Sequence, residues 1–456
     1  MLRSGGAEIQ AAIGMKLTRR QFGGFAAALP IAAGTIVNDP EVVIVGAGAA
    51  GIAAARVLMN GGRRVQVLEA APRIGGRCYT DTATFGFPFD RGAQWLHRFD
   101  KNPLTGLAKL HRFETVPHDP QEMLFVSGRL APAGANASYE RAYGDVSTAL
   151  AHAAEDEADL PAGQVLGALS GTDIDAWGPT AAASIGPLNM GVDFEAMSIK
   201  DWFELDEEEP NALVRQGLGT LIARLGAGVP VAVNTTVRAV SSGRGQVRVT
   251  TDRGIVTARA AIVTVSAGVL SSDAIGFDPG FDSTMQSALG GLQMGLLSKI
   301  ALFYAPRSPA LAFAEGSVLV PQVKDERGHY FLVRPLGVPL VMCFIGGSLA
   351  WDLATQSEAT NISFARDRLR ALLGARADQG LRGGASTSWG ANPLTRGAYA
   401  AAKPGASHAR YALSTPIGER VFLAGEALAG KASQTAHGAY QSGEAAARRV
   451  MQLLKR

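Results

Sequence analysis

The stretch that decides the fold is Val42-Val-Ile-Val45, followed by Gly46-Ala-Gly48-Ala-Ala-Gly51, an alanine-rich run to Asn60, Gly61-Gly62 and a second apolar segment. Four consecutive β-branched residues bounded by glycine are typical of a central strand in a parallel sheet. Residues 49–60 predict a helix, which the glycine pair ends. The sequence therefore predicts a βαβ unit.

The glycines of this unit follow the spacing G-x-G-x-x-G. Gly46 permits the tight turn, Gly48 lets the backbone approach a pyrophosphate, and Gly51 lets the helix pack closely on the strand. Ala49 and Ala50 begin the helix, and their N–H groups would face a negatively charged ligand. Strand, turn and helix in this order indicate dinucleotide binding.

A carboxylate and a second glycine turn come next. Glu69 ends the second strand about twenty residues on, where a carboxylate can accept hydrogen bonds from a ribose 2′-hydroxyl. Ala70 and then Gly75-Gly76-Arg77 follow, and the planar fork of Arg77 could meet the same pyrophosphate. This segment resembles the E-A-x-x-x-x-G-G-R motif of the flavin-dependent amine oxidases, which include monoamine oxidases, polyamine oxidases and the lysine-specific histone demethylase. The resemblance implies that the cofactor is FAD.

Bulk composition describes a globular protein of more than one domain. The chain has 456 residues, 47% of them hydrophobic and 18% charged. A net charge of +3 without a basic run gives no reason to expect nucleic acid as a partner. The seven histidines are scattered without a metal-binding spacing, so no metal is expected. Cys78 and Cys343 lie in different contexts, and a disulfide between them stays open.

Residues 1–38 are predicted to be a targeting segment. Thr18-Arg19-Arg20-Gln-Phe22 precedes a weakly apolar stretch, and the whole resembles a twin-arginine export signal. Met15 stands where such a signal would begin, so the true start could be Met1 or Met15. The resemblance implies contact with the export machinery and a periplasmic or exported protein, whereas a non-functional signal, or a simple N-terminal tail, would leave the protein in the cytoplasm.

The resemblance extends along the chain. Gly92-Ala93-Gln94-Trp95 matches a segment that passes beside the isoalloxazine in the family, and the backbone at Val237 matches a position that meets the adenine. Lys299 lies in an apolar stretch, Met294–Phe303, that predicts one strand. A lone cation there is costly to bury without a partner. The family joins a lysine at this position through a water to flavin N5.

The last matching segments lie near the C-terminus. Trp389 is implied to lie beside the flavin ring, and Tyr399 on the face where substrate binds. Ala398 occupies the position where covalent monoamine oxidases have a cysteine, so FAD is expected to be non-covalent. The match at Gly425-Glu426 implies a carboxylate for the ribitol.

Thr435-Ala436 opens the last predicted helix, whose first N–H groups would face the pyrimidine edge of the flavin. Monoamine oxidases have a second tyrosine where this chain has Thr435, so the aromatic pair around the amine is incomplete. Together Lys299, Tyr399, Trp389 and Thr435 are predicted to act in the reaction.

The expected fold is α/β, an FAD-binding Rossmann-like domain with an inserted α+β substrate domain of the amine oxidase type. The FAD-binding domain is predicted from residues 39–100, 211–275 and 405–456, with residues 231–240 as one strand. Residues 101–210 and 276–404 are predicted to form the substrate-binding domain.

The resemblance implies an FAD-dependent oxidoreductase that acts on the CH–NH group of a primary, secondary or polyamine. Hydride would pass to flavin N5, water would hydrolyse the imine, and O2 or another acceptor would reoxidise the flavin, with H2O2 as the product from O2. Two alternatives stay open: a desaturase or porphyrinogen-type oxidase acting on a C–C bond, and a non-catalytic flavin-binding protein. The identity of the amine, the electron acceptor and the oligomeric state also stay open.

Overall fold

The computed structural model describes residues 39–456 apart from 157, 206–208, 326 and 456, and these residues belong to one compact unit, Ala33–Arg456. The predicted targeting segment, 1–38, lies outside the described residues. None of the helices in the described part is long and apolar enough to cross a membrane. Cys78 and Cys343 are both buried and free, so the disulfide left open by the sequence is not formed.

A five-stranded parallel sheet contains the predicted βαβ unit. Its strand order is β10 (Val231–Ala232), β2 (Val65–Leu68), β1 (Val42–Val45), β14 (Ala260–Val263) and β23 (Val421–Leu423). Every residue of β1 is buried, as its β-branched run predicts for a central strand. Helix α1 (Ala49–Asn60) has the predicted bounds and is followed by Gly61.

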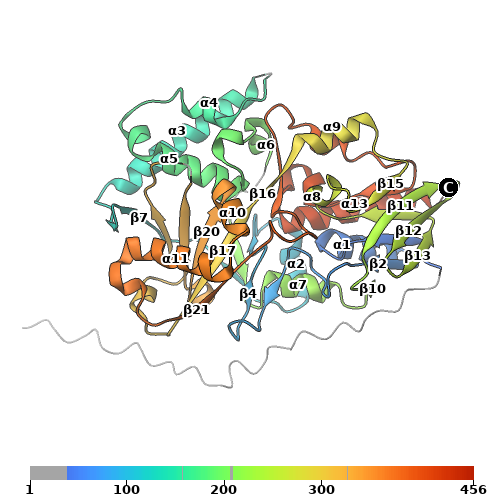
Figure 1. The fold of residues 1–456 in the computed structure, drawn as a ribbon, viewed down its shortest axis with the longest axis horizontal. Helices are drawn as coiled ribbons and strands as arrows, with labels where there is room; N and C mark the ends of the chain where they lie inside the picture. The colour runs from blue at the N-terminus through green and yellow to red at the C-terminus, as the bar shows by residue number, and fades with distance from the viewer. Residues whose placement is uncertain (1–38, 157, 206–208, 326, 456) are drawn as a thin grey trace, which may run out of the picture. The chain divides into compact units, whose positions relative to one another are not determined.

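Both faces of this sheet are covered. Helices α1, α7 (Leu218–Leu225) and α13 (Ala436–Leu453) pack on one face. The other face meets a four-stranded sheet in the order β13 (Gly254–Ala258), β12 (Gln246–Thr251), β11 (Val237–Gly243) and β15 (Gly276–Asp278). Figure 1 shows α1, α13 and β11 to β13 at the same end of the molecule as β2 and β10.

A seven-stranded sheet forms the other half of the described structure. Its order is β21 (Leu381–Ser386), β17 (Leu297–Tyr304), β20 (Leu340–Gly346), β19 (His329–Val333), β18 (Val318–Pro321), β7 (Glu122–Val126) and β8 (Arg129–Leu130). Helices α3 (Ala135–Glu155) and α5 (Thr172–Ile185) cover one face, and α10 (Gly347–Ala354) and α11 (Glu358–Leu373) cover the other. Strands from before residue 210 and after residue 276 therefore meet in one sheet.

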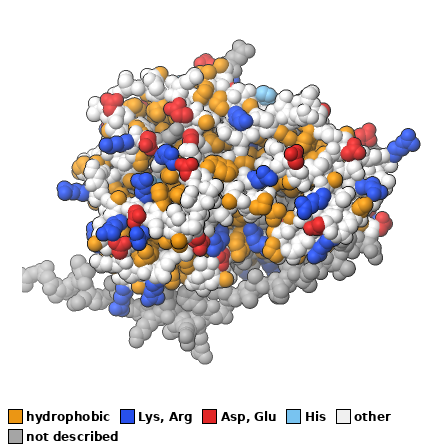
Figure 2. Space-filling view, in the orientation of Figure 1, with side chains coloured by type: hydrophobic (Ala, Val, Ile, Leu, Met, Phe, Trp, Pro, Cys, Tyr) orange, Lys and Arg blue, Asp and Glu red, His pale blue; other side chains and the backbone are white. Residues whose placement is uncertain are grey.

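The remaining elements are short connections and helices around the two sheets. They are β3 (Thr80–Asp81), β4 (Phe89–Asp90), β5 (Trp95–Leu96), β6 (Thr115–Pro117), β9 (Ala212–Val214), β16 (Leu292–Gly295), β22 (Tyr399–Ala402), α2 (Pro103–Leu110), α4 (Ala162–Leu166), α6 (Ile199–Glu204), α8 (Ala267–Leu270), α9 (Ser283–Gly291), α12 (Ala409–Ala412), the π-helix η1 (Gly186–Met190), and the 3-10 turns η2 (Phe194–Ala196), η3 (Pro309–Leu311), η4 (Pro335–Gly337), η5 (Gly374–Ala377), η6 (Glu426–Leu428) and η7 (Gly430–Ala432). On the face seen in Figure 2, basic and acidic side chains are interspersed.

Two predicted strands are each divided, so the prediction of a single strand was wrong in both cases. Residues 231–232 belong to the five-stranded sheet and residues 237–240 to the four-stranded sheet. The chain turns between these two strands, where Asn234 has a left-handed φ of +52°. Residues 294–303 are likewise shared between β16 and β17, which belong to different sheets. The N–H of Leu296 at this break donates to the carbonyl of Gly191 at 2.8 Å instead of continuing a ladder.

Candidate functional site

The turn between β1 and α1 is shaped by its glycines. Gly46 has a φ of +101°, and a Cβ on Gly51 would lie 1.9 Å from the carbonyl oxygen of Gly46. A Cβ on Gly48, in contrast, would meet nothing within 4 Å. Gly48 is also the N-cap of α1 and provides no side-chain hydrogen bond to Ala49, Ala50 or the rest of its first turn. The start of the helix is therefore closely packed on one side and open on the other, with N–H groups free for a ligand.

Glu69 lies at the carboxyl end of β2, directly beside this turn. Its carboxylate accepts a hydrogen bond from the N–H of Ala47 at 2.7 Å. It also accepts one from the N–H of Ala71 at 2.8 Å, so the chain turns at the intervening residue, Ala70. Burial raises the pKa of Glu69, and these two hydrogen bonds act in the opposite direction. The carbonyl of Glu69 accepts from the N–H of Thr235, so the segment leading to Val237 runs alongside.

The second glycine turn meets the C-terminal part of the chain. Gly76 packs so closely that its Cβ would lie 3.3 Å from the Cα of Gly48. Arg77 donates from Nη1 to a carboxylate oxygen of Glu426 at 3.0 Å and to the carbonyl of Ala398 at 2.6 Å. Gly425 has a φ of +149° and open space where a Cβ would be. The structure thus brings together predicted cofactor residues that are separated by more than three hundred positions.

The segment around Gly92 lies between Arg77 and Trp389. A Cβ on Gly92 would be 1.7 Å from the carbonyl oxygen of Arg77 and 3.2 Å from the indole of Trp389. The N–H of Ala93 donates to the same carbonyl at 3.2 Å. The indole N–H of Trp389 donates to the carbonyl of Arg91 at 2.9 Å, which fixes the ring against this segment.

Lys299 on β17 lies directly beneath the same segment. Its Nζ donates to the carbonyls of Asp90 at 2.8 Å and Gly92 at 2.7 Å, and to the side-chain oxygen of Gln94 at 2.7 Å. Only the protonated ammonium has three N–H donors for three acceptors. Burial acts in the opposite direction, because only 4% of Lys299 is exposed, and it lowers the pKa of Lys299 to about 7. Lys299 is thus a buried cation with three oxygen partners and a pKa near neutrality.

Aromatic rings surround this ammonium group. The ring centroids of Trp95 and Phe344 lie 5.7 Å and 5.5 Å from Nζ of Lys299. Phe344 pairs with Lys299 across the strands, and Tyr330 pairs with Phe344 on the next strand. The rings of Tyr330 and Phe344 are stacked at 4.6 Å. Lys299 therefore begins a row of side chains that crosses one face of the seven-stranded sheet.

Tyr399 is held by the π-helix η1. Its hydroxyl donates to the carbonyl of Asn189 at 2.7 Å. Gly191, just after this helix, has a φ of +70°, and a Cβ there would lie 2.9 Å from the Tyr399 ring. Short π-helical segments are often found at functional sites. Here the segment orients the predicted substrate-facing tyrosine.

Thr435 caps the last helix. Its hydroxyl accepts from the N–H of Gly438 at 2.9 Å and donates to the carbonyl of Ala432 at 2.7 Å. Helix geometry leaves the N–H of Ala436, the first residue of α13, without an acceptor inside the helix. The contacts of Thr435 are those of an N-cap, so a direct role for Thr435 in the reaction stays a prediction.

Several residues of this arrangement were not predicted. Phe344 lies in β20, Leu340–Gly346, whose residues are all buried, so the pattern does not reveal which side chains share a face with Lys299. Tyr330 and Asn189 likewise have no local signal. For Tyr330 and Phe344, the signal that could have found them is cross-strand register, which a single sequence does not contain.

Comparisons with known proteins agree with this geometry. The profile of the family described as "Flavin containing amine oxidoreductase" matches residues 49–451. The chain is 28% identical over 465 residues to polyamine oxidase 4 of Oryza sativa subsp. japonica, which covers 92% of this chain and 90% of that protein. It is also 28% identical to polyamine oxidase 2 of Arabidopsis thaliana, covering 90% of this chain and 88% of that protein.

A solved structure shares the fold. Cyclohexylamine oxidase from Brevibacterium oxydans IH-35A superposes with a TM-score of 0.76 and 20% identity, covering 92% of this chain and all of that one (100%). This likeness agrees with the α/β fold of the amine oxidase type expected from the sequence. Since the family profile spans nearly all of the described residues, the chain belongs to the flavin-containing amine oxidoreductase family.

Proposed function

We propose that this amine oxidase binds FAD non-covalently, with the dinucleotide lying between the β1–α1 turn and the N-terminus of α13. Three observations fit such a ligand. The first turn of α1 lacks a side-chain cap and adjoins open space at Gly48. Glu69 is a buried carboxylate at the end of β2, where it can accept a hydrogen bond that a ribose hydroxyl donates. The side-chain Oε1 of Gln434, next to α13, is buried without a partner among the described residues.

Non-covalent attachment follows from the absence of a nucleophile at the matching position. Ala398 has no thiol there, and its carbonyl is bound by Arg77. Cys78 lies close to the second glycine turn, but burial raises the pKa of its thiol to about 12. A thiol that stays protonated at neutral pH is a poor nucleophile.

We propose that the reaction is the oxidation of a C–H bond next to an amine nitrogen. When bound, FAD supplies the acceptor for the hydride that leaves this carbon. The chain's own contribution is to hold the amine in place and exclude water. Trp95 packs on the fully buried ring of Phe344, and Tyr399 presents a ring held by Asn189. The resulting imine is then hydrolysed by water to a carbonyl compound and an amine or ammonia.

The burial and the contacts of Lys299 are the observation that best supports this proposal. Lys299 is buried beside two aromatic rings and joined to the backbone of the Gly92 segment, so its amino group is held next to the proposed flavin position. A structural lysine would more often extend its charged end to water. The polarising charge and the N-terminal dipole of α13 would both stabilise negative charge on a bound cofactor.

An anaerobic titration of the purified flavoprotein with a panel of amines tests the proposal. We expect the absorbance of the oxidised flavin to bleach with at least one monoamine, diamine or polyamine, and to return on addition of oxygen with release of peroxide. If no amine bleached the flavin while a compound with a C–C bond to desaturate did, the proposal would be replaced by a desaturase. Failure of every donor would favour a non-catalytic flavin-binding protein.

We also propose export by the twin-arginine pathway, for which the support is the sequence alone. Arg19 and Arg20 precede an apolar stretch in residues 1–38. Replacing both by lysine should retain the protein in the cytoplasm of a host that has this pathway, whereas the unchanged chain should be exported. Equal distribution of the two proteins would contradict export by this route.

A further inference from the structure

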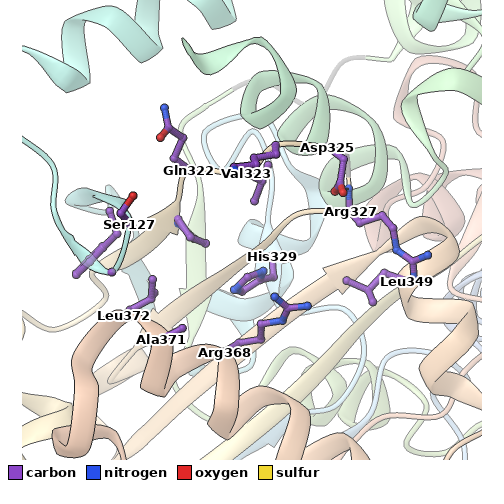
Figure 3. A pocket seen from close by; sticks show the side chains of 14 residues that line it. Ser127, Gln322, Val323, Asp325, Arg327, His329, Leu349, Arg368, Ala371 and Leu372 are labelled. Atoms are coloured by element: carbon purple, nitrogen blue, oxygen red, sulfur yellow. The ribbon is translucent and has the colours of Figure 1, made fainter. Parts of the chain in front are cut away.

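A cavity lies on the opposite face of the seven-stranded sheet from Lys299. It has a volume of about 500 Å³ and lies among the β7–β8 turn, the β18–β19 loop, α10 and α11 (Figure 3). His329 forms part of its lining and adjoins Tyr330 in β19. Because consecutive side chains of a strand point to opposite faces, the row from Lys299 to Tyr330 faces away from this cavity.

His329 is a buried polar group in this cavity. It is only 7% exposed, and its ring meets that of Phe331 edge-on at 5.5 Å. Within the described part of the chain, no hydrogen bond to its ring nitrogens is found. Figure 3 shows the ring beside Arg368 in the middle of the cavity. Because His329 lines the cavity, a ligand in the cavity can form a hydrogen bond with its ring.

Arg368 on α11 brings a positive charge to the same place. Its guanidinium lies over the ring of Phe364 at 5.1 Å, and no carboxylate among the described residues forms an ion pair with it. Arg327 at the rim differs, because it pairs with Asp352 at 2.5 Å. Burial, together with the charge of Arg368, lowers the pKa of His329 to about 4, which leaves the histidine neutral at neutral pH.

Part of the remaining lining of the cavity is apolar, and the other part carries the polar side chains of Ser127, Gln322, Lys324 and Asp325. Phe125, Leu349 and Leu372 form part of its lining, and each is at most 8% exposed. A ligand that fits both parts has a charged head and an apolar body. The head must be an anion, because a free arginine recognises carboxylate or phosphate through its planar fork.

We propose that this cavity binds a small organic anion, with a carboxylate or phosphate head held by Arg368 and His329 and an apolar body against Phe125, Leu349 and Leu372. The ligand differs in charge from the amine substrate proposed for the site at Lys299. The two sites occupy opposite faces of one sheet, so binding at one need not displace the ligand of the other. This inference is independent of which amine the enzyme oxidises.

The test uses the flavin-loaded enzyme and three probes: hexanoate, hexyl phosphate and inorganic phosphate. Hexanoate and hexyl phosphate share an apolar body and differ in the head, and inorganic phosphate lacks the body. We expect at least one hexyl probe to bind in calorimetry with a Kd below about 10 mM, and inorganic phosphate to bind more weakly. The tighter of the two hexyl probes identifies the head.

A matched pair of variants locates the binding. Arg368→Met should weaken it by about tenfold or more, the equivalent of one charge-assisted hydrogen bond. Arg370→Met changes an arginine on the same helix that pairs with Asp378 at 3.5 Å and does not line the cavity, so binding should stay within twofold of wild type.

Histidine ring NMR supplies the second readout, with the His329 signal assigned from a His329→Gln variant. Two other histidines serve as references because neither lines the cavity: His97 bonds to the side chain of Asn211, and His118 accepts from the indole of Trp95. We expect the probe to shift the His329 resonance and to leave those of His97 and His118 unchanged. The proposal is overturned if no hexyl probe binds, if Arg368→Met binds as wild type does, or if only His97 and His118 respond.

Discussion

The proposed FAD site has a nucleotide end at the β1–α1 turn and a reaction end around Lys299, and the two ends are formed by different kinds of contact. At the β1–α1 turn, most contacts are made by backbone atoms and glycines, and two side chains bond to the turn, the hydroxyl of Thr264 and the carboxylate of Glu69. Around Lys299, a single side chain bonds to three oxygens that lie 205, 207 and 209 positions away in the chain. The first end depends on the absence of side chains, and the second on the presence of particular ones.

This difference determines how each end should fail. Adding one methyl group at a packed glycine should disturb the nucleotide end, because the new atom would clash with backbone atoms that are themselves closely packed. Removing a charge disturbs the reaction end, because buried oxygens lose their donor. Away from both ends, a buried ion pair joins Asp201 of α6 to Arg410 of α12, and Arg410 also bonds to the carbonyls of Ala400 and Ala427.

The largest effect is expected at this ion pair. Arg410 donates two hydrogen bonds to Asp201, at 2.7 Å and 2.9 Å, and others to the carbonyls of Ala400 and Ala427. Asp201→Ala leaves a buried guanidinium uncompensated and should lower the free energy of unfolding by about 3–5 kcal/mol. Urea denaturation measures it.

The matched control is Glu444→Ala, which removes an exposed partner of Arg448 and should cost at most about 0.5 kcal/mol. Similar losses in the two variants would mean that the buried pair contributes no more to stability than an exposed one. Flavin content of Asp201→Ala, measured in parallel, shows whether the nucleotide end loosens with the reaction end.

The next effect is expected at the reaction end itself. Lys299→Met should keep its flavin, because the nucleotide end is intact, and should slow flavin reduction or reoxidation by about 10²-fold or more. Stopped-flow absorbance separates the two half-reactions. Lys403→Met is the control, since the side chain of Lys403 is exposed and its ammonium donates to the carbonyl of Gly290 at 2.9 Å. Rates within twofold of wild type in Lys299→Met would remove Lys299 from the mechanism.

The same contrast explains what the sequence could predict. The β1–α1–β2 unit was confirmed with the predicted helix bounds, because glycine spacing, β-branched residues and a following acid are all local signals. The convergence of Arg77 with Glu426, and of Lys299 with the Gly92 segment, was available only through family resemblance. No pattern within a single chain encodes which distant segments meet.

The remaining site features depend on tertiary packing. The position of Tyr399 depends on a π-helix whose residues, Gly186-Pro-Leu-Asn-Met190, contain no helix-forming pattern. Residues 294–303 look like one continuous strand, yet the chain changes sheets at Leu296 because its N–H bonds to Gly191. Assignments of individual residues to flavin or substrate stay predictions.

A smaller effect should distinguish two glycines of the nucleotide end. Gly51→Ala places a Cβ 1.9 Å from a backbone oxygen and should destabilise the protein by about 1–3 kcal/mol. Gly48→Ala meets nothing within 4 Å and should unfold as wild type does, but should weaken FAD binding because its methyl group enters the proposed phosphate position. Thermal unfolding without flavin measures the stability of both variants, and a flavin titration measures their affinity for FAD. Equal flavin affinity in Gly48→Ala and wild type would place the phosphates elsewhere.

At the reaction end, Gly191→Ala should have a comparable or smaller effect. A φ of +70° costs a non-glycine residue about 1–2 kcal/mol, and the new Cβ would press on the Tyr399 ring at 2.9 Å. We expect the specificity constant kcat/KM for the amine to fall by about tenfold while flavin binding stays unchanged. Gly228→Ala is the control for backbone strain, because Gly228 has a φ of +81° but no atom within 4 Å of its Cβ. Loss of activity in both variants alike would mean that strain, and not the tyrosine, is responsible.

The smallest effect is a pH dependence that belongs to Lys299. Its pKa in the folded protein is about 7, below the value of about 10.4 in an unfolded chain. Between these two pH values the unfolded chain binds more protons than the folded protein, so the free energy of unfolding rises with pH. Burying the charged Lys299 therefore lowers stability by its full amount below pH 7, and this loss decreases as the pH rises above 7. The unfolding free energy of wild type relative to Lys299→Met should therefore increase by about 1 kcal/mol from pH 7 to pH 8. A constant difference over this range would mean that the three oxygen acceptors keep Lys299 charged despite its burial, and that the reaction end relies on a permanent positive charge.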